Sequence, residues 1–240
     1  MVTQLESALQ GQITPEMEQV AHQEAVAPEF IRQGVAGGNI VIPRNILRDS
    51  IVPVAIGTGL KTKVSASVGL YGSTGDIAAE VAKIKAAVQA GTNAIMDLSV
   101  SGDIDAMRQE TLAAAPTPVG TLPMYQALAE AGEKYGSSTK MEVEELFDVI
   151  ERQAAGGVDF LALHCGTTMD VVERAKKEGR IDPLVSYGGS HLIGWMVYNR
   201  RENPLYENYD RLLEIARKYD VTISLADGMR PGCLADSLDG

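Results

Sequence analysis

Cysteine is nearly absent from this sequence, and its scarcity limits the chemistry the chain can support. Only Cys165 and Cys233 occur among 240 residues, far apart and without a CxxC spacing. The pattern therefore excludes a disulfide framework, and neither thiol belongs to a metal-type cysteine motif. The three histidines are scattered as well. We predict no metal site, and we expect both thiols to be reduced and partly buried.

Long apolar runs and an excess of positive charge are also missing. No run approaches the roughly 18 apolar residues of a membrane span, and residues 1–27 are polar, without the apolar core of a signal peptide. We therefore expect a cytoplasmic protein. Lysine and arginine total 21 against 32 acidic residues, a net charge of −11. This balance argues against nucleic acid and anionic membranes as partners, while a locally positive pocket for a small phosphorylated molecule stays open.

The residues that are present alternate between β-rich apolar runs and helical stretches. We expect strands at Lys63–Gly69, Ala94–Leu98, Pro118–Leu122, Asp159–His164, Pro183–Ser186 and Val221–Leu225. Between them, Ile77–Ala90 is the clearest helix, with one apolar face and Gly91 as its stop. Runs with little alternation indicate burial on both faces, as in a parallel sheet. No GxGxxG follows the first strand, so we expect an α/β fold of the (β/α)8 TIM-barrel type rather than a dinucleotide-binding sheet.

The same pattern predicts the domain organisation. Residues 1–58 form a small helical extension, in which Thr14-Pro15 and Ala27-Pro28 start two helices and Gly37-Gly38 ends the second. Residues 59–240 form about six βα units of the barrel. A barrel of eight lacks two of its units here, which leaves edge strands without partners. We therefore expect the barrel to be truncated after strand six, as in a fragment of a longer protein.

Barrel enzymes place reacting groups at the carboxyl ends of the strands, and every strand predicted here ends in polar or small residues. Residues 186–190 (SYGGS) offer hydroxyls and unhindered N–H groups before a helix; this suits a phosphate, although a tight turn has the same composition. Arg230 suits a phosphate, a carboxylate or a surface ion pair. His164 suits a hydrogen bond, proton transfer or a core position. Asp97 and Asp227 suit sugar hydroxyls or helix caps.

In order and spacing, these motifs resemble the phosphomethylpyrimidine synthase (ThiC) family over nearly the whole chain. The matching segments are Gln12–Glu18, Val41–Pro43, Ile95–Ser99, Pro118–Thr121, Tyr125–Ala127, His164–Gly166, Glu202–Tyr206 and Asp227–Gly232. The resemblance implies a radical S-adenosylmethionine carbon–carbon lyase that converts 5-aminoimidazole ribonucleotide to hydroxymethylpyrimidine phosphate in thiamine biosynthesis. It also implies a 4Fe–4S cluster, S-adenosylmethionine, zinc and a homodimer.

The resemblance further implies the substrate contacts, although it assigns no catalytic residue on this chain. The implied contacts are Ser67, Met96, Tyr125, His164, Ser186, Tyr187, Gly188, Asp227, Gly228, Met229 and Arg230. Two of them have simpler alternatives, since Tyr125 also suits the wall of an amphipathic helix and Met96 also suits a core.

The chain departs from the family pattern in three ways. Ser65 and Ser67 stand where the family has Asn, and a serine lacks the paired donor and acceptor of an amide. Tyr187 stands where the family usually has Arg, so the phosphate cradle loses a cation. The family's motifs for the cluster and zinc ligands are expected beyond residue 240. The first two departures favour a paralogue that makes 5-hydroxybenzimidazole for anaerobic cobamide synthesis. We take the thiamine branch as the first interpretation, because most motifs are retained, and the paralogue as its alternative.

Two other classes of function stay open from the residues alone. A redox-free phosphosugar aldolase or decarboxylase needs a lysine or a carboxylate pair inside the barrel, and Lys61 and Lys63 are the only lysines beside the first strand. A non-catalytic truncated barrel needs no chemistry at all. Metal-free turnover of a phosphosugar would support the first class, and failure to bind the ribonucleotide would favour the second.

Overall fold

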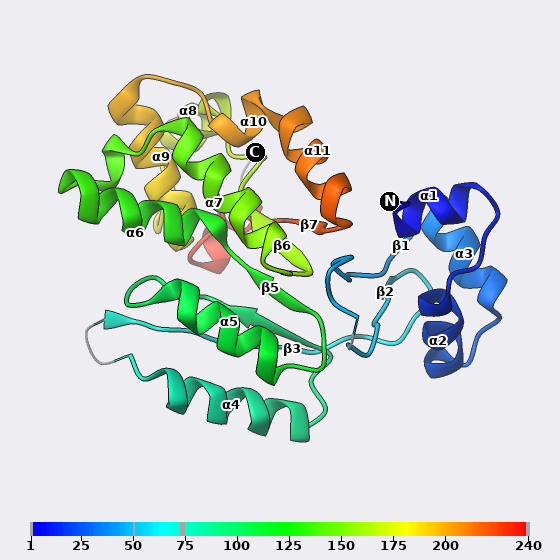
Figure 1. The fold of residues 1–240 in the computed structure, drawn as a ribbon. Helices are drawn as coiled ribbons and strands as arrows, with labels where there is room; N and C mark the ends of the chain where they lie inside the picture. Colours follow the sequence, from blue (N-terminus) through cyan, green and yellow to red (C-terminus); the bar gives the residue numbers. More distant parts are fainter. Residues whose placement is uncertain (1, 50, 73–74, 239–240) are drawn as a thin grey trace. The chain divides into compact units, whose positions relative to one another are not determined.

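The computed structural model describes residues 2–49, 51–72 and 75–238 (Figure 1). The chain forms two compact units. The first unit contains Met1–Thr121, Glu151–Leu161 and Ile215–Ile223, and the second contains Leu122–Ile150, Ala162–Glu214 and Ser224–Gly240. Each unit is therefore assembled from segments that lie far apart in the sequence.

Three short helices begin the first unit: α1 (Gln4–Leu9), α2 (Pro15–Glu24) and α3 (Pro28–Ala36). The Thr14 hydroxyl oxygen accepts a hydrogen bond from the Met17 N–H at 3.2 Å, and Pro15 and Pro28 occupy the first turns of α2 and α3. Both predicted helix starts are confirmed. The sequence pattern does not predict α1, whose N-terminus is capped by a capping box between Thr3 and Glu6.

An antiparallel ribbon follows, formed by β1 (Ile40–Val41) and β2 (Ile56–Gly57). Sequence reasoning missed this ribbon, because strands of two residues are too short to show an alternating pattern.

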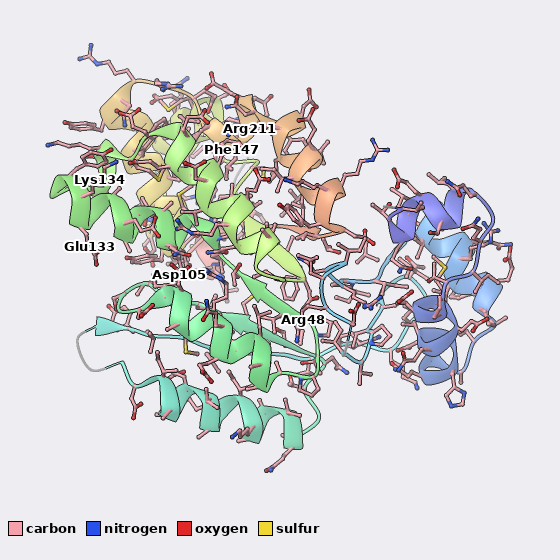
Figure 2. All side chains as sticks on the ribbon, in the orientation of Figure 1. Arg48, Asp105, Glu133, Lys134, Phe147 and Arg211 are labelled. Carbon is pink, nitrogen blue, oxygen red and sulfur yellow. The ribbon has the colours of Figure 1, made fainter. Side chains whose placement is uncertain are left out.

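A buried polar cluster in the first unit holds the start of β6 (Phe160–Leu163). Asp159 is fully buried and accepts hydrogen bonds from the backbone N–H groups of Asn45 (2.9 Å) and Val119 (2.8 Å). The Arg48 guanidinium, labelled in Figure 2, donates to Asp159 Oδ2 at 2.6 Å and also to three backbone carbonyls. Burial raises the pKa of Asp159, and the charge of Arg48 opposes that rise.

Five parallel strands make the main sheet, in the same order as in the sequence. They are β3 (Ser65–Val68), β4 (Ala94–Asp97), β5 (Val119–Thr121), β6 and β7 (Thr222–Leu225). Helix α4 (Ile77–Gln89) follows β3, as the 3.6-residue periodicity predicts, and helix α5 (Ile104–Ala114), which the sequence pattern does not predict, follows β4. Ile84 of α4, Ile95 of β4 and Met107 of α5 are fully buried in one apolar core.

Helices make up most of the second unit. It contains α6 (Pro123–Tyr135), α8 (Met169–Glu178), α9 (Tyr187–Asn199), α10 (Pro204–Glu207), the starts of α7 (Val143–Ala155) and α11 (Tyr209–Tyr219), and the 3-10 turns η2 (Ser138–Lys140) and η3 (Leu234–Asp236). The Arg211 guanidinium on α11 lies 4.3 Å from the centre of the Phe147 ring on α7 (Figure 2). Trp195 of α9 is buried, and its indole N–H donates to the Met141 carbonyl at 2.7 Å.

The strand predicted at Pro183–Ser186 is wrong. These residues form no strand, and Ser186 is the N-cap of α9, its hydroxyl oxygen accepting from the Gly189 N–H at 3.1 Å. Two local features favour this outcome, since proline has no N–H to give a sheet and serine is a preferred N-cap. The strand next to β6 is instead β7, because the Thr222 N–H donates to the Asp159 carbonyl at 3.1 Å and the Ala226 N–H donates to the Leu163 carbonyl at 2.9 Å.

The α/β class and the parallel sheet are thus confirmed, and in the described part of the chain this sheet has five strands rather than the six predicted. In that part, β3 and β7 are the two end strands of the sheet, so a closed barrel stays a prediction. Among the described residues, no helix has both the length and the apolar character that crossing a membrane requires.

Candidate functional site

Three segments of the second unit meet at the start of α9. They are the loop that follows β6 and begins with His164, the residues Ser186–Gly189, and Gly228 after β7. A Cβ added at Gly189 would lie 2.0 Å from the Gly228 carbonyl oxygen, and one added at Gly228 would lie 2.1 Å from the Thr167 hydroxyl oxygen. Real Cβ atoms do not approach other atoms so closely. The three segments can therefore pack this tightly only because glycine has no side chain.

His164 is the buried titratable group at this meeting point. It is 2% exposed; its Nε2 lies 3.2 Å from the Ser186 hydroxyl oxygen, whereas Nδ1 has no hydrogen-bond partner. Burial is the main cause that lowers the pKa of His164, with Asp227 opposing this shift and Arg230 adding to it. The imidazole is therefore neutral at neutral pH. His164 is therefore not a core histidine with both ring nitrogens hydrogen-bonded, since its Nδ1 remains available for a hydrogen bond.

The segment predicted as a phosphate cradle is the capped start of a helix. Backbone N–H groups and the positive end of the helix dipole are concentrated there, which favours an anion. The Tyr125 and Tyr187 rings lie edge to face with centres 5.1 Å apart, and Tyr187 also stacks on His191 at 4.4 Å. Burial is the main cause that raises the pKa of Tyr125, so its hydroxyl stays protonated as a hydrogen-bond donor. Aromatic rings thus border this helix start.

Asp227 and Arg230 lie in the exposed segment after β7. Arg230 Nε lies 3.7 Å from Asp227 Oδ2, and the two side chains are 54% and 66% exposed, respectively. Such an exposed pair contributes little to stability, so either group can turn to a ligand at small cost. Asp227 is not the N-cap of η3, a position that Cys233 occupies. The Met229 carbonyl accepts a hydrogen bond from Arg180 at 2.6 Å, which fixes the backbone between the two charged residues.

Two of the predicted contacts, Ser67 and Met96, belong to the first unit. They are neighbours in register on β3 and β4, with Ser67 exposed and Met96 half-buried. The next residue, Asp97, caps no helix; its Oδ1 accepts from the N–H and the hydroxyl of Ser99 at 3.0 and 2.6 Å. The other nine predicted contacts belong to the second unit. That all eleven surround one molecule stays a prediction.

The lysines of the phosphosugar alternative are engaged elsewhere in the first unit. Lys61 Nζ donates to the Gln23 carbonyl at 2.8 Å, and Lys63 Nζ lies 3.0 Å from the Glu24 carboxylate. Both amines therefore hold the segment before β3 against the end of α2. A Schiff-base lysine needs an amine that is free to attack a carbonyl, whereas both of these amines are engaged with protein groups.

Sequence reasoning assigned no role to Asn203. This residue is fully buried, and its Nδ2 donates to the carbonyls of His164 and Thr167 at 2.8 and 3.0 Å. The Asn203-Pro204 pair signals a turn or an N-cap. Asn203 is indeed the N-cap of α10, but the sequence carries no signal for the distant carbonyls that it holds.

The residues present do not fit the metal groups that the resemblance implies. Iron–sulfur clusters are held by cysteine thiolates, and the chain has only two cysteines. Burial raises the pKa of the Cys165 thiol to about 11, and Cys233 Sγ donates to Asp236 at 3.2 Å. Within the described ranges, no three His, Cys, Asp or Glu side chains are grouped to hold a metal ion. No chemical step is therefore assigned to a metal on these residues.

Comparisons with known proteins identify the family. Residues 3–240 match the model of the radical SAM ThiC family. The chain is 77% identical, over 98% of its length, to a 5-hydroxybenzimidazole synthase BzaA of Moorella thermoacetica, and 59% identical, over 99%, to a BzaA of Eubacterium limosum. It is 56% identical, over 99% of its length, to a phosphomethylpyrimidine synthase of Moorella thermoacetica. The matches cover 55%, 56% and 55% of these relatives. The chain thus spans about half the length of the curated relatives it matches, and it belongs to the radical SAM ThiC family.

Proposed function

We propose that this chain forms the substrate-binding part of a 5-hydroxybenzimidazole synthase, which makes the lower-ligand base for anaerobic cobamide biosynthesis. One comparison carries the proposal. Moorella thermoacetica provides relatives of both kinds, and the chain is 77% identical to its 5-hydroxybenzimidazole synthase but 56% identical to its phosphomethylpyrimidine synthase. Because both relatives come from one organism, the difference reflects the kind of enzyme rather than the distance between species.

This proposal reverses the order in which the sequence motifs alone placed the two products. The retained motifs put the thiamine branch first, whereas the identities support the alternative better. The replacements at Ser67 and Tyr187 agree with the new order. Phosphomethylpyrimidine synthase remains the second candidate, supported by the family motifs and by several relatives of that name at 50–51% identity.

The proposed substrate is 5-aminoimidazole ribonucleotide, which both products require. In the second unit, the capped start of α9 suits its phosphate, and the exposed Asp227 suits its ribose hydroxyls. Tyr187 brings no charge to the phosphate. Arg230 is the cation whose charge acts on both His164 and Tyr125. We therefore assign the compensating charge to Arg230 and the α9 N–H groups, and a hydrogen bond to the substrate to the unpaired Nδ1 of His164.

Several further expectations belong to the same proposal. The main sheet becomes part of a (β/α)8 barrel formed by residues 59–240 and the rest of the protein, with residues 1–58 as its helical extension. The protein works in the cytoplasm as a homodimer. A radical SAM enzyme uses S-adenosylmethionine and an iron–sulfur cluster. We propose that the ligands of the cluster and of zinc lie in the part of the relatives that this chain does not match.

Product analysis tests the proposal. The full-length protein is reconstituted anaerobically, supplied with 5-aminoimidazole ribonucleotide and S-adenosylmethionine, and its products are identified by mass spectrometry. The expected product is 5-hydroxybenzimidazole. Hydroxymethylpyrimidine phosphate in its place would establish the second candidate. Turnover of a phosphosugar without any cluster would support the aldolase alternative instead.

A further inference from the structure

Two buried asparagines hold the two ends of β6 by the same set of hydrogen bonds. Asn45 and Asn203 are both 0% exposed. The side-chain oxygen of each accepts from the N–H two residues later, Leu47 or Leu205, at 2.9 Å. Each Nδ2 then donates to backbone carbonyls of a distant segment. An amide group provides this combination of acceptor and paired donors, and no other side chain of its size does.

The two asparagines differ in what they hold. Asn45 Nδ2 donates to the carbonyls of Ala154 and Val158 at 2.7 and 2.9 Å, before β6 begins. Asn203 Nδ2 donates to the carbonyls of His164 and Thr167 at 2.8 and 3.0 Å, with the Cys165 carbonyl at 3.5 Å. The second set belongs to the loop that carries His164. Asn203 therefore acts on the candidate site, whereas Asn45 holds a segment that has no part in it.

Glu202 strengthens the hold on this loop. Its carboxylate accepts from the Asn203 N–H at 2.7 Å and from the Met169 N–H, at the first position of α8, at 3.0 and 3.1 Å. A carboxylate is favoured at a helix N-terminus. Residues 202 and 203 therefore fix both the start of the His164 loop and the start of the helix that follows it.

The orientation of the His164 ring depends on this loop. The ring has one side-chain hydrogen bond, between Nε2 and the Ser186 hydroxyl, and Nδ1 has no hydrogen-bond partner. A Cβ at Gly188 would lie 2.4 Å from the ring Cε1, so the space beside the ring is narrow. Since the ring makes only this hydrogen bond, its position depends strongly on the backbone of the loop that carries His164.

We propose that Asn203 is the positioning residue of His164, holding the loop so that the imidazole stays packed against the start of α9. The proposal rests on the proposed function only for the identity of the ligand. Asn203 contacts neither substrate nor reacting atoms in this account. Its effect reaches the ligand through His164.

An NMR pH titration of the histidine ring signals of the 240-residue chain tests this role. The chain has only three histidines, and His164→Gln assigns the His164 signal. Asn203→Ser keeps an N-cap for α10 but cannot reach the loop carbonyls. Asn45→Ser makes the same change at the other end of β6 and is the matched control. In Asn203→Ser, the pKa of His164 is expected to rise toward its ordinary value of 6.5, because the ring becomes more exposed. Asp227, Arg230 and Tyr125, the charged and titratable groups around the ring, are unchanged.

Calorimetry with 5-aminoimidazole ribonucleotide gives the second reading. Affinity is expected to fall about tenfold or more in Asn203→Ser, because small misplacements of a contact are costly, and to stay unchanged in Asn45→Ser, although both variants lose stability. If Asn203→Ser does not fold, Asn203→Thr, which also keeps an N-cap and also cannot reach the loop carbonyls, is studied by the same two measurements. An unchanged pKa of His164 in the Asn203 variant, or an equal rise of that pKa in Asn45→Ser, would overturn the proposal. If the wild-type chain does not bind the ribonucleotide, the proposed substrate fails, while the ring signal still decides the role of Asn203.

Discussion

Alanine substitutions in α9 test the close packing on which the candidate site depends. The helix has glycines at positions 188, 189 and 194, so one chemical change can be compared at three places. A Cβ at Gly189 would lie 2.0 Å from the Gly228 carbonyl oxygen, whereas a Cβ at Gly194 would have no atom within 4 Å. The carbonyl is backbone and cannot turn aside as a flexible side chain does. The first change must therefore separate two segments, and the last disturbs nothing.

The expected free energies of unfolding follow from these contacts. Gly194→Ala gains the helix propensity of alanine, so stability rises by about 0.5–1 kcal/mol. Gly189→Ala has the same gain but also an overpacking cost of about 1–3 kcal/mol, which leaves it clearly less stable than Gly194→Ala. Gly188→Ala is intermediate in stability, because its Cβ meets the rings of His164 and Tyr125 at 2.4 and 3.0 Å. This variant displaces His164 and therefore weakens ligand binding most relative to its loss of stability.

Urea denaturation of the three variants, followed by circular dichroism, measures these differences. Equal midpoints and slopes for Gly189→Ala and Gly194→Ala would show that α9 does not approach Gly228 as described. Unchanged ribonucleotide affinity in Gly188→Ala would separate His164 from the binding site.

Three further predictions concern other parts of the molecule. Burial raises the pKa of Asp220 from 3.8 to about 6. A raised carboxyl pKa contributes stability that is present below pH 3.8 and is lost as the pH rises through 6. In urea titrations, Asp220→Asn should therefore be more stable than the wild type by up to about 3 kcal/mol at pH 7, and equal to it near pH 4. Asp220 has a left-handed φ of 53°, which asparagine tolerates, and equal stability at pH 7 would contradict the burial. Arg48→Ala leaves the fully buried Asp159 without its cation, so the free energy of unfolding should fall by about 3–5 kcal/mol; a loss below about 1 kcal/mol would refute this role. The pKa of Cys165 is about 11, so iodoacetamide at pH 8 should label the partly exposed Cys233 first in the folded chain, and peptide mass mapping that finds Cys165 labelled first would contradict its burial.

The elements that the sequence predicted well are those whose signals are local. Thr14-Pro15 marks the start of α2, and the apolar positions of Ile77–Ala90 mark α4, because caps and periodicity depend on neighbours in the chain. The strand predicted at Pro183–Ser186 is wrong, because a short apolar run between helical stretches indicates a strand while proline and serine carry the opposite local signal. At this segment the residue preferences of proline and serine decide the local structure, and a helix begins where the alternation predicts a strand.

Long-range contacts explain what the sequence could not show. The residues chosen for the site included His164 and Gly228, yet nothing in their neighbourhoods indicated that one ring nitrogen would be unpaired or that two glycine backbones would touch. Asn203 was overlooked for the same reason, since its carbonyl partners lie 36 or more residues away. The family, in contrast, is readable from the order of many short motifs, and the family match over residues 3–240 confirms it.

The affinity of this chain for 5-aminoimidazole ribonucleotide tests the candidate site at the start of α9 most sharply. Isothermal calorimetry is carried out on the wild type, on His164→Gln, and on Gly194→Ala as the control in the same helix. We expect the wild type and Gly194→Ala to bind alike, and His164→Gln to bind at least about tenfold more weakly because one buried hydrogen bond is lost. Binding by His164→Gln as tight as that of the wild type would contradict the site described here.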